Sequence, residues 1–468
     1  MDLFEEKIKA YAGKETVLVP DGFDERIEKK LAGLPFRNAK KNPVLKVLLV
    51  AAVFSILSAV TVLASPDIRR MAQGIISYFS AGQISAYSSQ KKELEKYNSA
   101  VGVAVQDQGI ILKIDNIAVD DGYINVFYTV QSNSPITIVG SEDTPMTWRL
   151  GWTAPRFFFK ADGRELAWPA LIEQEAYLEN DSTLKGMERF AVVESLPDNF
   201  RLELSTDQVL GVKGKWQMTL TIDKSATQAD TLVVTPGIQA SVTSGWENLH
   251  KHDITVDKVL ISPFGSQLIL SEKSFDGGLF GEASFALRDD RGRFLDIVPS
   301  QRWAGAEKQT MKVTNSFEFL KGSTRMKTLT LIPVASNLKQ IVATDGSYSP
   351  VMATAPLGPL PQRLQQNELG AVVVDAVDLS EQGLKITYHS QGILEFVHFS
   401  LLDQNDRELK DLKLAVDQTV DRQTGRHTDT YTFTHHPSAA AIARISRIGI
   451  ITYDLKLKTE EQIVIPLQ

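Results

Sequence analysis

The chain has 468 residues, 43% of them hydrophobic, and a formal net charge of -7. This modest negative charge argues against nucleic acid as a main partner, because proteins that bind nucleic acids neutralise phosphates with basic surfaces. The chain contains no cysteine, which excludes disulfides, thiolate catalysis and cysteine-ligated zinc or iron–sulfur sites. Its hydrophobic content is sufficient for several domains stabilised by apolar cores alone.

Residues 1–46 predict a short, partly helical segment. Asp21 can cap a helix that Gly33 and Pro35 end. Apolar side chains recur along this helix at helical spacing, namely Phe23, Ile27, Leu31 and Leu34. The segment is too short to build a domain alone, so two interpretations stay open. It is either a solvated or membrane-surface tether, or a helix that binds a cytoplasmic partner through these four candidate residues.

Residues 47–66 contain no charged side chain and are dominated by leucine, valine, isoleucine and alanine. A helix of about 20 such residues spans roughly 30 Å, the thickness of the hydrocarbon core of a bilayer. The segment therefore predicts a single transmembrane helix in the lipid bilayer. A buried core helix and a cleaved signal peptide are the alternatives, the latter because Val62-Leu63-Ala64 resembles a cleavage site.

The charges around this segment predict its orientation. Basic residues precede it in excess, namely Arg26, Lys29, Lys30, Arg37, Lys40, Lys41 and Lys46. Such an excess keeps the preceding end of the chain in the cytoplasm. We therefore expect a single-pass protein of the cell membrane, with a cytoplasmic N-terminus and an extracellular C-terminal region.

Residues 67–98 predict a helical stalk. The apolar side chains from Ile68 to Phe79 suggest that a helix continues beyond the bilayer, and residues 89–97 form a second amphipathic stretch. An amphipathic helix packed on the first β domain explains the same pattern equally well.

From about Val101 the apolar period changes to two, with turn residues between the alternating stretches. The predicted fold class is therefore mainly β, with a transmembrane helix followed by tandem immunoglobulin-like antiparallel β-sandwich modules. We expect module 1 at 100–230, module 2 at 236–350 and module 3 at 368–468. The proline-rich stretch 349–364 predicts a semi-rigid linker.

Three sequence elements recur in the same order and support three copies of one module. The first is an apolar-Asp-x-apolar motif, at 114–117, 256–259 and 374–377. The second is an aromatic strand that leads into an acidic turn and Arg-x-Leu, at 157–166, 285–295 and 399–409. The third is a late alternating strand, at 216–222, 329–334 and 448–457.

No motif predicts a catalytic, cofactor-binding or metal-binding site, and we expect none and no enzyme activity. A calcium loop at Asp289, Asp290 and Asp296 is the weaker alternative to a structural turn. Aromatic residues gather in module 1, namely Trp148, Trp152, Trp168, Phe157, Phe158 and Phe159. Core packing is the expected role of this cluster, and a ligand-facing patch is the alternative.

The sequence resembles a family of Gram-positive single-pass proteins, described as anti-sigma-factor-like, that carry an ectodomain of unknown function. The resemblance rests on residues 19–35, the basic flank and apolar segment at 37–66, and the first hairpin through 122–132. It extends more loosely to the immunoglobulin-like module at 236–350. The resemblance implies that the cytoplasmic segment holds an extracytoplasmic-function sigma factor and that the outer region senses envelope conditions.

Two further functions compete with such a regulator. A structural or adhesive cell-surface protein needs residues 1–46 only as an anchor and has no cytoplasmic signalling role. A hydrolase built on the β modules ranks last, because no catalytic motif is present. A cell-wall or envelope component is an expected partner in the first two cases.

Overall fold

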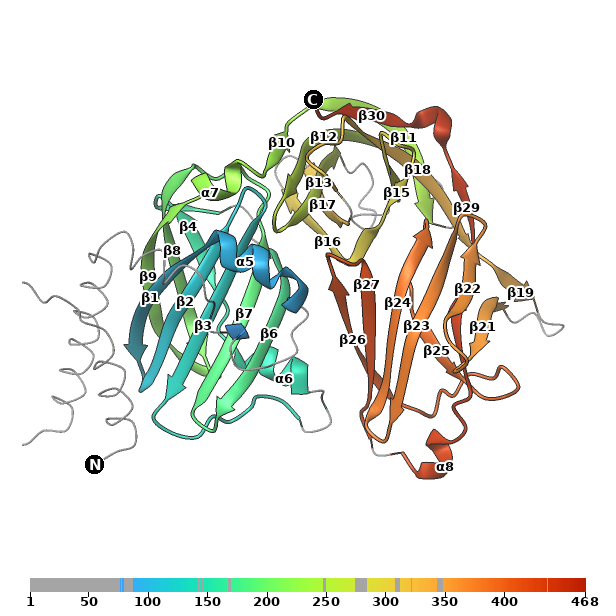
Figure 1. Cartoon of the computed structure of the whole chain (residues 1–468), viewed down its shortest axis with the longest axis horizontal. Helices are drawn as coiled ribbons and strands as arrows, with labels where there is room; N and C mark the ends of the chain where they lie inside the picture. Colours follow the sequence, from blue (N-terminus) through green and yellow to red (C-terminus); the bar gives the residue numbers. More distant parts are fainter. Residues whose placement is uncertain are drawn as a thin grey trace, which may run out of the picture. The chain divides into compact units, whose positions relative to one another are not determined.

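The computed structural model describes the chain in segments: residues 76, 78–79, 87–141, 144, 146–166, 170–246, 250–273, 284–307, 312–320, 322–342, 348–435 and 437–468. The predicted cytoplasmic segment 1–46 and transmembrane helix 47–66 lie outside these residues. No helix within them is long and apolar enough to cross a membrane. The described part is mainly β, as predicted (Figure 1).

Module 1 consists of two antiparallel sheets. The larger has the order β1-β2-β3-β7-β6, with β1 (Asn98–Asp107), β2 (Ile110–Val119), β3 (Tyr123–Ser132), β7 (Thr183–Ala191) and β6 (Ala170–Asn180). The smaller has the order β5-β4-β8-β9, with β5 (Arg164–Glu165), β4 (Phe158–Ala161), β8 (Asn199–Val209) and β9 (Val212–Asp223). Two helices, α6 (Met146–Thr153) and α7 (Ser225–Gln228), complete it.

Module 2 repeats this plan with two sides that a short parallel pairing, Gly245 with Ala335 and Trp246 with Ser336, joins into one continuous sheet. One side has the order β11-β12-β13-β17-β16, with β11 (Ile238–Trp246), β12 (His250–Ser262), β13 (Gly265–Lys273), β17 (Lys312–Phe319) and β16 (Ile297–Glu307), while β10 (Leu232–Val234) also pairs with β12. The other side contains β15 (Phe294–Leu295), β14 (Phe285–Asp289) and β18 (Thr328–Leu338).

Module 3 has the order β22-β23-β24-β27-β26 in its larger sheet, with β22 (Gln362–Asn367), β23 (Gly370–Ser380), β24 (Gly383–Gly392), β27 (Arg426–Phe433) and β26 (Leu414–Asp421). Its smaller sheet contains β21 (Met352–Pro356), β28 (Arg447–Ile451) and β25 (Phe399–Leu402). Outside the sheets of module 3 are α8 (Ala439–Ile442), η3 (Thr459–Glu461) and the pair β19 (Gln340–Val342) and β20 (Tyr348–Pro350). The two last strands, β29 (Tyr453–Leu457) and β30 (Ile463–Pro466), pair with β18 of module 2.

The first recurring motif marks a β-bulge in every module. The pairing register skips Asp115 between β2 and β3, Asp257 between β12 and β13, and Asp375 between β23 and β24. In two modules the bulge carboxylate binds the facing strand: Thr129 donates to Asp115 at 2.6 Å, and His389 Nδ1 lies 2.9 Å from Asp375. The motif therefore marks a β-bulge that recurs in the central hairpin of each module.

The second motif forms the predicted turn. Asp289 accepts the backbone N–H groups of Arg291 and Arg293 at 3.0 and 2.8 Å, and Asp403 accepts that of Arg407 at 3.0 Å. The leucines that follow the three turns, Leu166, Leu295 and Leu409, are buried. These acids therefore close turns, and no group of acidic or histidine side chains in the described part of the chain is arranged to hold a metal ion.

The third motif marks equivalent strands in modules 2 and 3 but not in module 1, which corrects the sequence-based alignment. In module 3 the stretch 448–451 lies in β28, which pairs with β25. The stretch 329–334 lies in β18, which pairs with β14. In module 1 the strand equivalent to β14 is β4, and it pairs with β8, so β8 is the equivalent of β18. The stretch 216–222 lies instead in β9, which pairs with the other edge of β8. Both β8 and β9 alternate apolar and polar residues, so the pattern alone does not distinguish them.

In each smaller sheet, one further strand pairs with the strand equivalent to β18, and it comes from a different part of the chain in each module. In module 1 it is β9, which follows β8 directly. In module 3 it is β21, from the stretch 349–364 that the sequence predicted as a linker. In module 2 it is β30, which pairs with β18 after the chain has passed through module 3 (Figure 1, red). The segment expected as module 3, 368–468, thus also contributes to module 2.

Each module has its own apolar core. A further apolar cluster covers the outer face of β3 and β7, where Phe127 and Met187 contact residues that precede the first strand. These residues include Ile76, Tyr78, Phe79 and Tyr87, together with Leu94 of α5 (Lys91–Tyr97), which follows η2 (Ser88–Gln90). The described part of the predicted stalk 67–98 therefore packs on module 1, as the alternative interpretation required.

Candidate functional site

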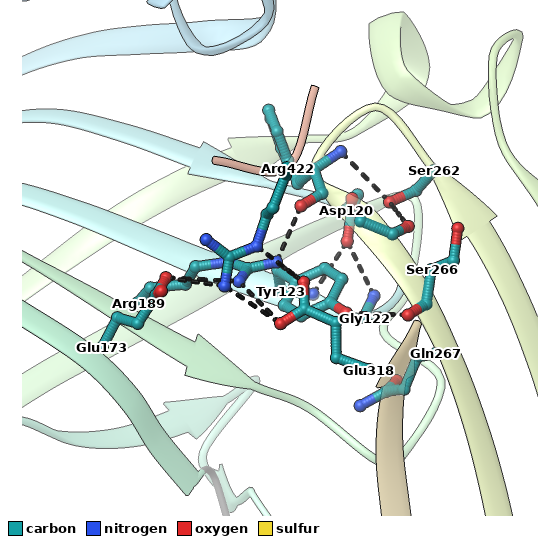
Figure 2. Close-up of polar contacts among 12 residues, drawn as sticks. Asp120, Gly122, Tyr123, Glu173, Arg189, Ser262, Ser266, Gln267, Glu318 and Arg422 are labelled. Atoms are coloured by element: carbon teal, nitrogen blue, oxygen red, sulfur yellow. Dashed lines mark hydrogen bonds and ion pairs between the residues drawn. The ribbon is translucent and has the colours of Figure 1, made fainter. Parts of the chain in front are cut away.

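Three deeply buried charged side chains meet where the three modules contact one another. Arg189 lies on β7 of module 1, Glu318 on β17 of module 2, and Arg422 in the turn between β26 and β27 of module 3. Their exposed fractions are 0%, 3% and 5%. Figure 2 shows the Glu318 carboxylate between the two guanidinium groups. We call these three residues the joint.

Both arginines bind Glu318 through two nitrogen atoms. Arg189 donates to Oε1 at 2.9 Å and to Oε2 at 3.2 Å. Arg422 donates to the same two oxygens at 2.7 and 3.0 Å. Paired N–H groups on a carboxylate give the strongest and most directional of the ion pairs in proteins. The joint therefore fixes the orientation of the three side chains as well as their distance.

The charges in the joint shift one another's pKa values. Burial by itself raises the pKa of Glu318, but Arg189 and Arg422 outweigh it and lower this pKa to about 2. Burial disfavours the charged form of Arg422, yet Glu173 and Glu318 raise its pKa well above the usual value. All three groups are therefore ionised at neutral pH, and the two arginines keep Glu318 charged despite its burial.

Neighbouring groups complete the joint. Arg189 stacks over the ring of Tyr123, with 4.0 Å between Cζ and the ring centre, and donates to the carbonyl oxygen of Phe264 at 2.7 Å. A Cβ on Gly265 would lie 2.8 Å from an Arg189 nitrogen and 2.9 Å from Glu318. The hairpin turn of module 2 therefore approaches the joint so closely that only glycine fits there.

Glu173 extends the joint to the residues that precede the first strand. It lies on β6 and is bound by Arg422 at 2.9 Å and by Arg189 at 3.4 Å. The Tyr87 hydroxyl donates to the same carboxylate oxygen at 2.6 Å. The stretch between the predicted membrane helix and module 1 is thus connected to the contact of all three modules.

Buried carboxyl groups of a different kind lie inside modules 1 and 3. Glu188 on β7 and Asp429 on β27 are both 0% exposed, and each accepts a hydrogen bond from a glutamine on the adjacent edge strand. These bonds are 3.1 Å from Gln174 and 3.0 Å from Gln418. Among the described residues no basic side chain pairs with either carboxyl group, and burial raises the pKa of Glu188 and that of Asp429, the latter to about 6.

A small pocket lies between modules 2 and 3. Its volume of about 60 Å³ is room for roughly four or five water molecules. The lining includes Phe285, Tyr388, Ile393, Phe396 and His427.

The predicted partner-binding residues, Phe23, Ile27, Leu31 and Leu34, lie outside the described residues, and their role stays a prediction. The aromatic cluster of module 1 divides. Phe157 and Phe159 lie in the core, whereas Phe158 is 50% exposed and Trp148 and Trp152 are 42% and 54% exposed. Core packing was therefore the wrong expectation for these last three side chains.

Sequence reasoning missed the joint completely. Glu318 stands between two phenylalanines in an alternating strand, and Arg422 stands in a polar turn. Both contexts are typical of solvent-exposed charges. Arg189 and Glu318 are 129 positions apart, so no local pattern connects them.

One family model matches part of the chain. It is described as "Domain of unknown function (DUF4179)" and covers residues 39–132, from the basic flank through β3. No curated protein matches.

Among solved structures, similarity is found to "the conserved domain protein from Bacillus anthracis", with 12% identity, coverage of 58% of this chain and 92% of that chain, and a TM-score of 0.40. A structure of surface layer protein SbsC, domains 1–6, is 12% identical, with coverage of 89% and 62% and a TM-score of 0.16. These scores are too low to support an argument about fold or function.

Proposed function

We propose that the chain is a single-pass membrane protein whose immunoglobulin-like modules lie outside the cell and act as one sensing unit. Its cytoplasmic segment, residues 1–46, then regulates a partner such as an extracytoplasmic-function sigma factor. The observation that carries the proposal is the joint, in which one residue from each module is buried and ionised. A signal that binds any one module can then affect the module nearest the membrane.

The uncharged segment 47–66 and its basic flank support the membrane part of the proposal. The connection of Tyr87 to Glu173 supports the transmission part, because Tyr87 stands between that segment and module 1. A ligand shifts such a system only if it binds two arrangements of the modules with different affinity. An envelope component that bridges two modules would meet this requirement.

The topology is testable with single cysteines, because the chain has none of its own. We expect Lys410→Cys, on a side chain 82% exposed in module 3, to react with a membrane-impermeant maleimide in intact cells. Lys14→Cys should react only after the cells are permeabilised. Equal labelling of both variants in intact cells would contradict the proposed orientation.

The regulatory role is testable with the full-length protein. Ile27→Asp places a charge on the predicted apolar stripe and should abolish co-purification of the cytoplasmic partner. Lys30→Asp, which alters the charge on a polar position of the same helix, is the matched control. Equal recovery of bound proteins with both variants, or no bound protein with the unchanged chain, would reject the regulator.

A structural or adhesive surface protein is the second candidate, and its supporting observation is the repetition of one module three times. Deletion of residues 1–36, which keeps the basic residues next to the membrane, distinguishes the two. The deletion should remove regulation but leave adhesion or wall structure unchanged.

A further inference from the structure

The final strand of the chain completes module 2 rather than the module that precedes it. β30 pairs with β18 through Thr330 and Val464 and through Leu329 and Ile465. Along β30, Ile463, Ile465 and Leu467 point into the core, with exposed fractions of 7%, 0% and 4%, while Val464 is 51% exposed. Module 2 therefore presents a strand-binding groove beside β18, which accepts an extended segment with alternating apolar residues.

Besides strand pairing and the burial of its apolar side chains, polar contacts hold this segment. Leu467 N–H donates to the Lys327 carbonyl at 2.8 Å, and Arg288 donates to the Gln462 side chain at 3.0 Å. Glu461, in the short helix η3, accepts the Thr243 backbone N–H. These contacts are specific to residues 459–467 and do not depend on which chain supplies the segment.

The three modules fill the equivalent position by different routes. In module 1, β9 follows its partner β8 through a tight turn, with Val209 opposite Val212. In module 2, about 130 residues separate β18 from β30, and they contain all of module 3. The strand beside β18 therefore comes from beyond module 3 in the sequence.

We propose that this groove is an interaction site for the 459–467 segment of a second copy, so that two chains associate by exchanging β30. An exchanged strand makes the same contacts as the chain's own strand, and only the effective concentration of the linked segment favours the closed form. η3 and the residues next to it, 458–462, form the hinge, while β29 remains paired with β18 of its own chain.

Cysteine pairs in full-length protein test this exchange, because the unchanged chain contributes no thiol. Thr330 and Val464 face each other across an antiparallel pair, where Cα atoms about 4.5–5.5 Å apart allow a disulfide. Thr330→Cys and Val464→Cys chains are unfolded, mixed, refolded together and oxidised. We expect a disulfide-linked pair of the two chains whose yield rises with chain concentration.

Two controls make every outcome decisive. The double variant Thr330→Cys/Val464→Cys should form the disulfide within one chain. A mixture of Val464→Cys with Thr219→Cys, at an exposed position on β9, should give only background cross-linking. A within-chain disulfide without any Thr330–Val464 cross-link between chains would overturn the proposal. So would equal cross-linking to Thr219, or failure of the double variant to form its disulfide.

Discussion

The joint between the modules and the buried carboxyl groups inside modules 1 and 3 shift the pKa of the same chemical group in opposite directions. Glu318 is held between two guanidinium groups, which lower its pKa to about 2 despite burial. Asp429 is equally buried but has only neutral hydrogen-bond donors, and burial raises its pKa to about 6. The difference shows that the partner decides in which direction the pKa of a buried carboxyl group moves.

Module 2 sharpens this comparison. Glu188 and Asp429 lie opposite Val126 and Ile386, which occupy the same place after the bulge in their modules. The equivalent residue of module 2 is Leu268, and the residue opposite it on β17 is Phe317. Its ring packs in the apolar core of the module. Module 2 thus has no buried carboxyl group at this position and instead supplies Glu318, the next residue, to the joint.

Removing the central carboxylate should have the largest effect. Glu318→Ala leaves two buried guanidinium groups without their shared partner, which costs about 3–5 kcal/mol of unfolding free energy. Chemical denaturation of the full chain measures this loss. Glu165→Ala, at a side chain 83% exposed, is the control and should stay within about 0.5 kcal/mol of the unchanged protein. Similar losses for the two variants would show that the joint contributes nothing.

Acid should weaken the joint in a defined window. The pKa of Glu318 is lower in the folded chain, so its contribution is complete above the unfolded value of 4.5 and decreases as the pH falls towards 2. The decrease amounts to about 3 kcal/mol. The difference in unfolding free energy between the unchanged chain and Glu318→Gln should therefore shrink below pH 4.5. A difference independent of pH would contradict an ionised Glu318.

Asp429 should show the opposite sign. Its pKa is raised to about 6, so the folded chain holds a proton that the unfolded chain has already released. Stability from this group therefore decreases as the pH rises from about 4 to 6, by about 2–3 kcal/mol. Asp429→Asn, which imitates the protonated acid, should remove this slope. An unchanged slope between pH 4 and 6 in this variant would show that Asp429 is not the group that titrates there.

An exposed ion pair should have the smallest effect. Arg444 and Asp411 are 2.7 Å apart, but both are about half exposed, at 49% and 56%. Arg444→Ala should change the unfolding free energy by less than about 0.5 kcal/mol, because solvent screens the pair. A loss comparable to that of Glu318→Ala would show that burial does not set the strength of these pairs.

Local patterns in the sequence predicted much of the fold but not its connections. Alternation predicted the strands, and the recurring motifs at Asp115, Asp257 and Asp375 indicated equivalent hairpins, although not that each aspartate forms a bulge. The partner of β30 was not predictable, because alternation records which face of a strand is buried and not which strand lies beside it. The joint was missed for a related reason, since Arg189, Glu318 and Arg422 become neighbours only when three modules are packed together.

The central claim, that the joint makes three modules one unit, is tested most directly by calorimetric unfolding of the full chain at pH 7. We predict a single cooperative transition for the modules of the unchanged protein, which Glu318→Ala separates into two or more. Separate transitions in the unchanged protein, identical to those of the variant, would show that the modules unfold independently and would contradict the account.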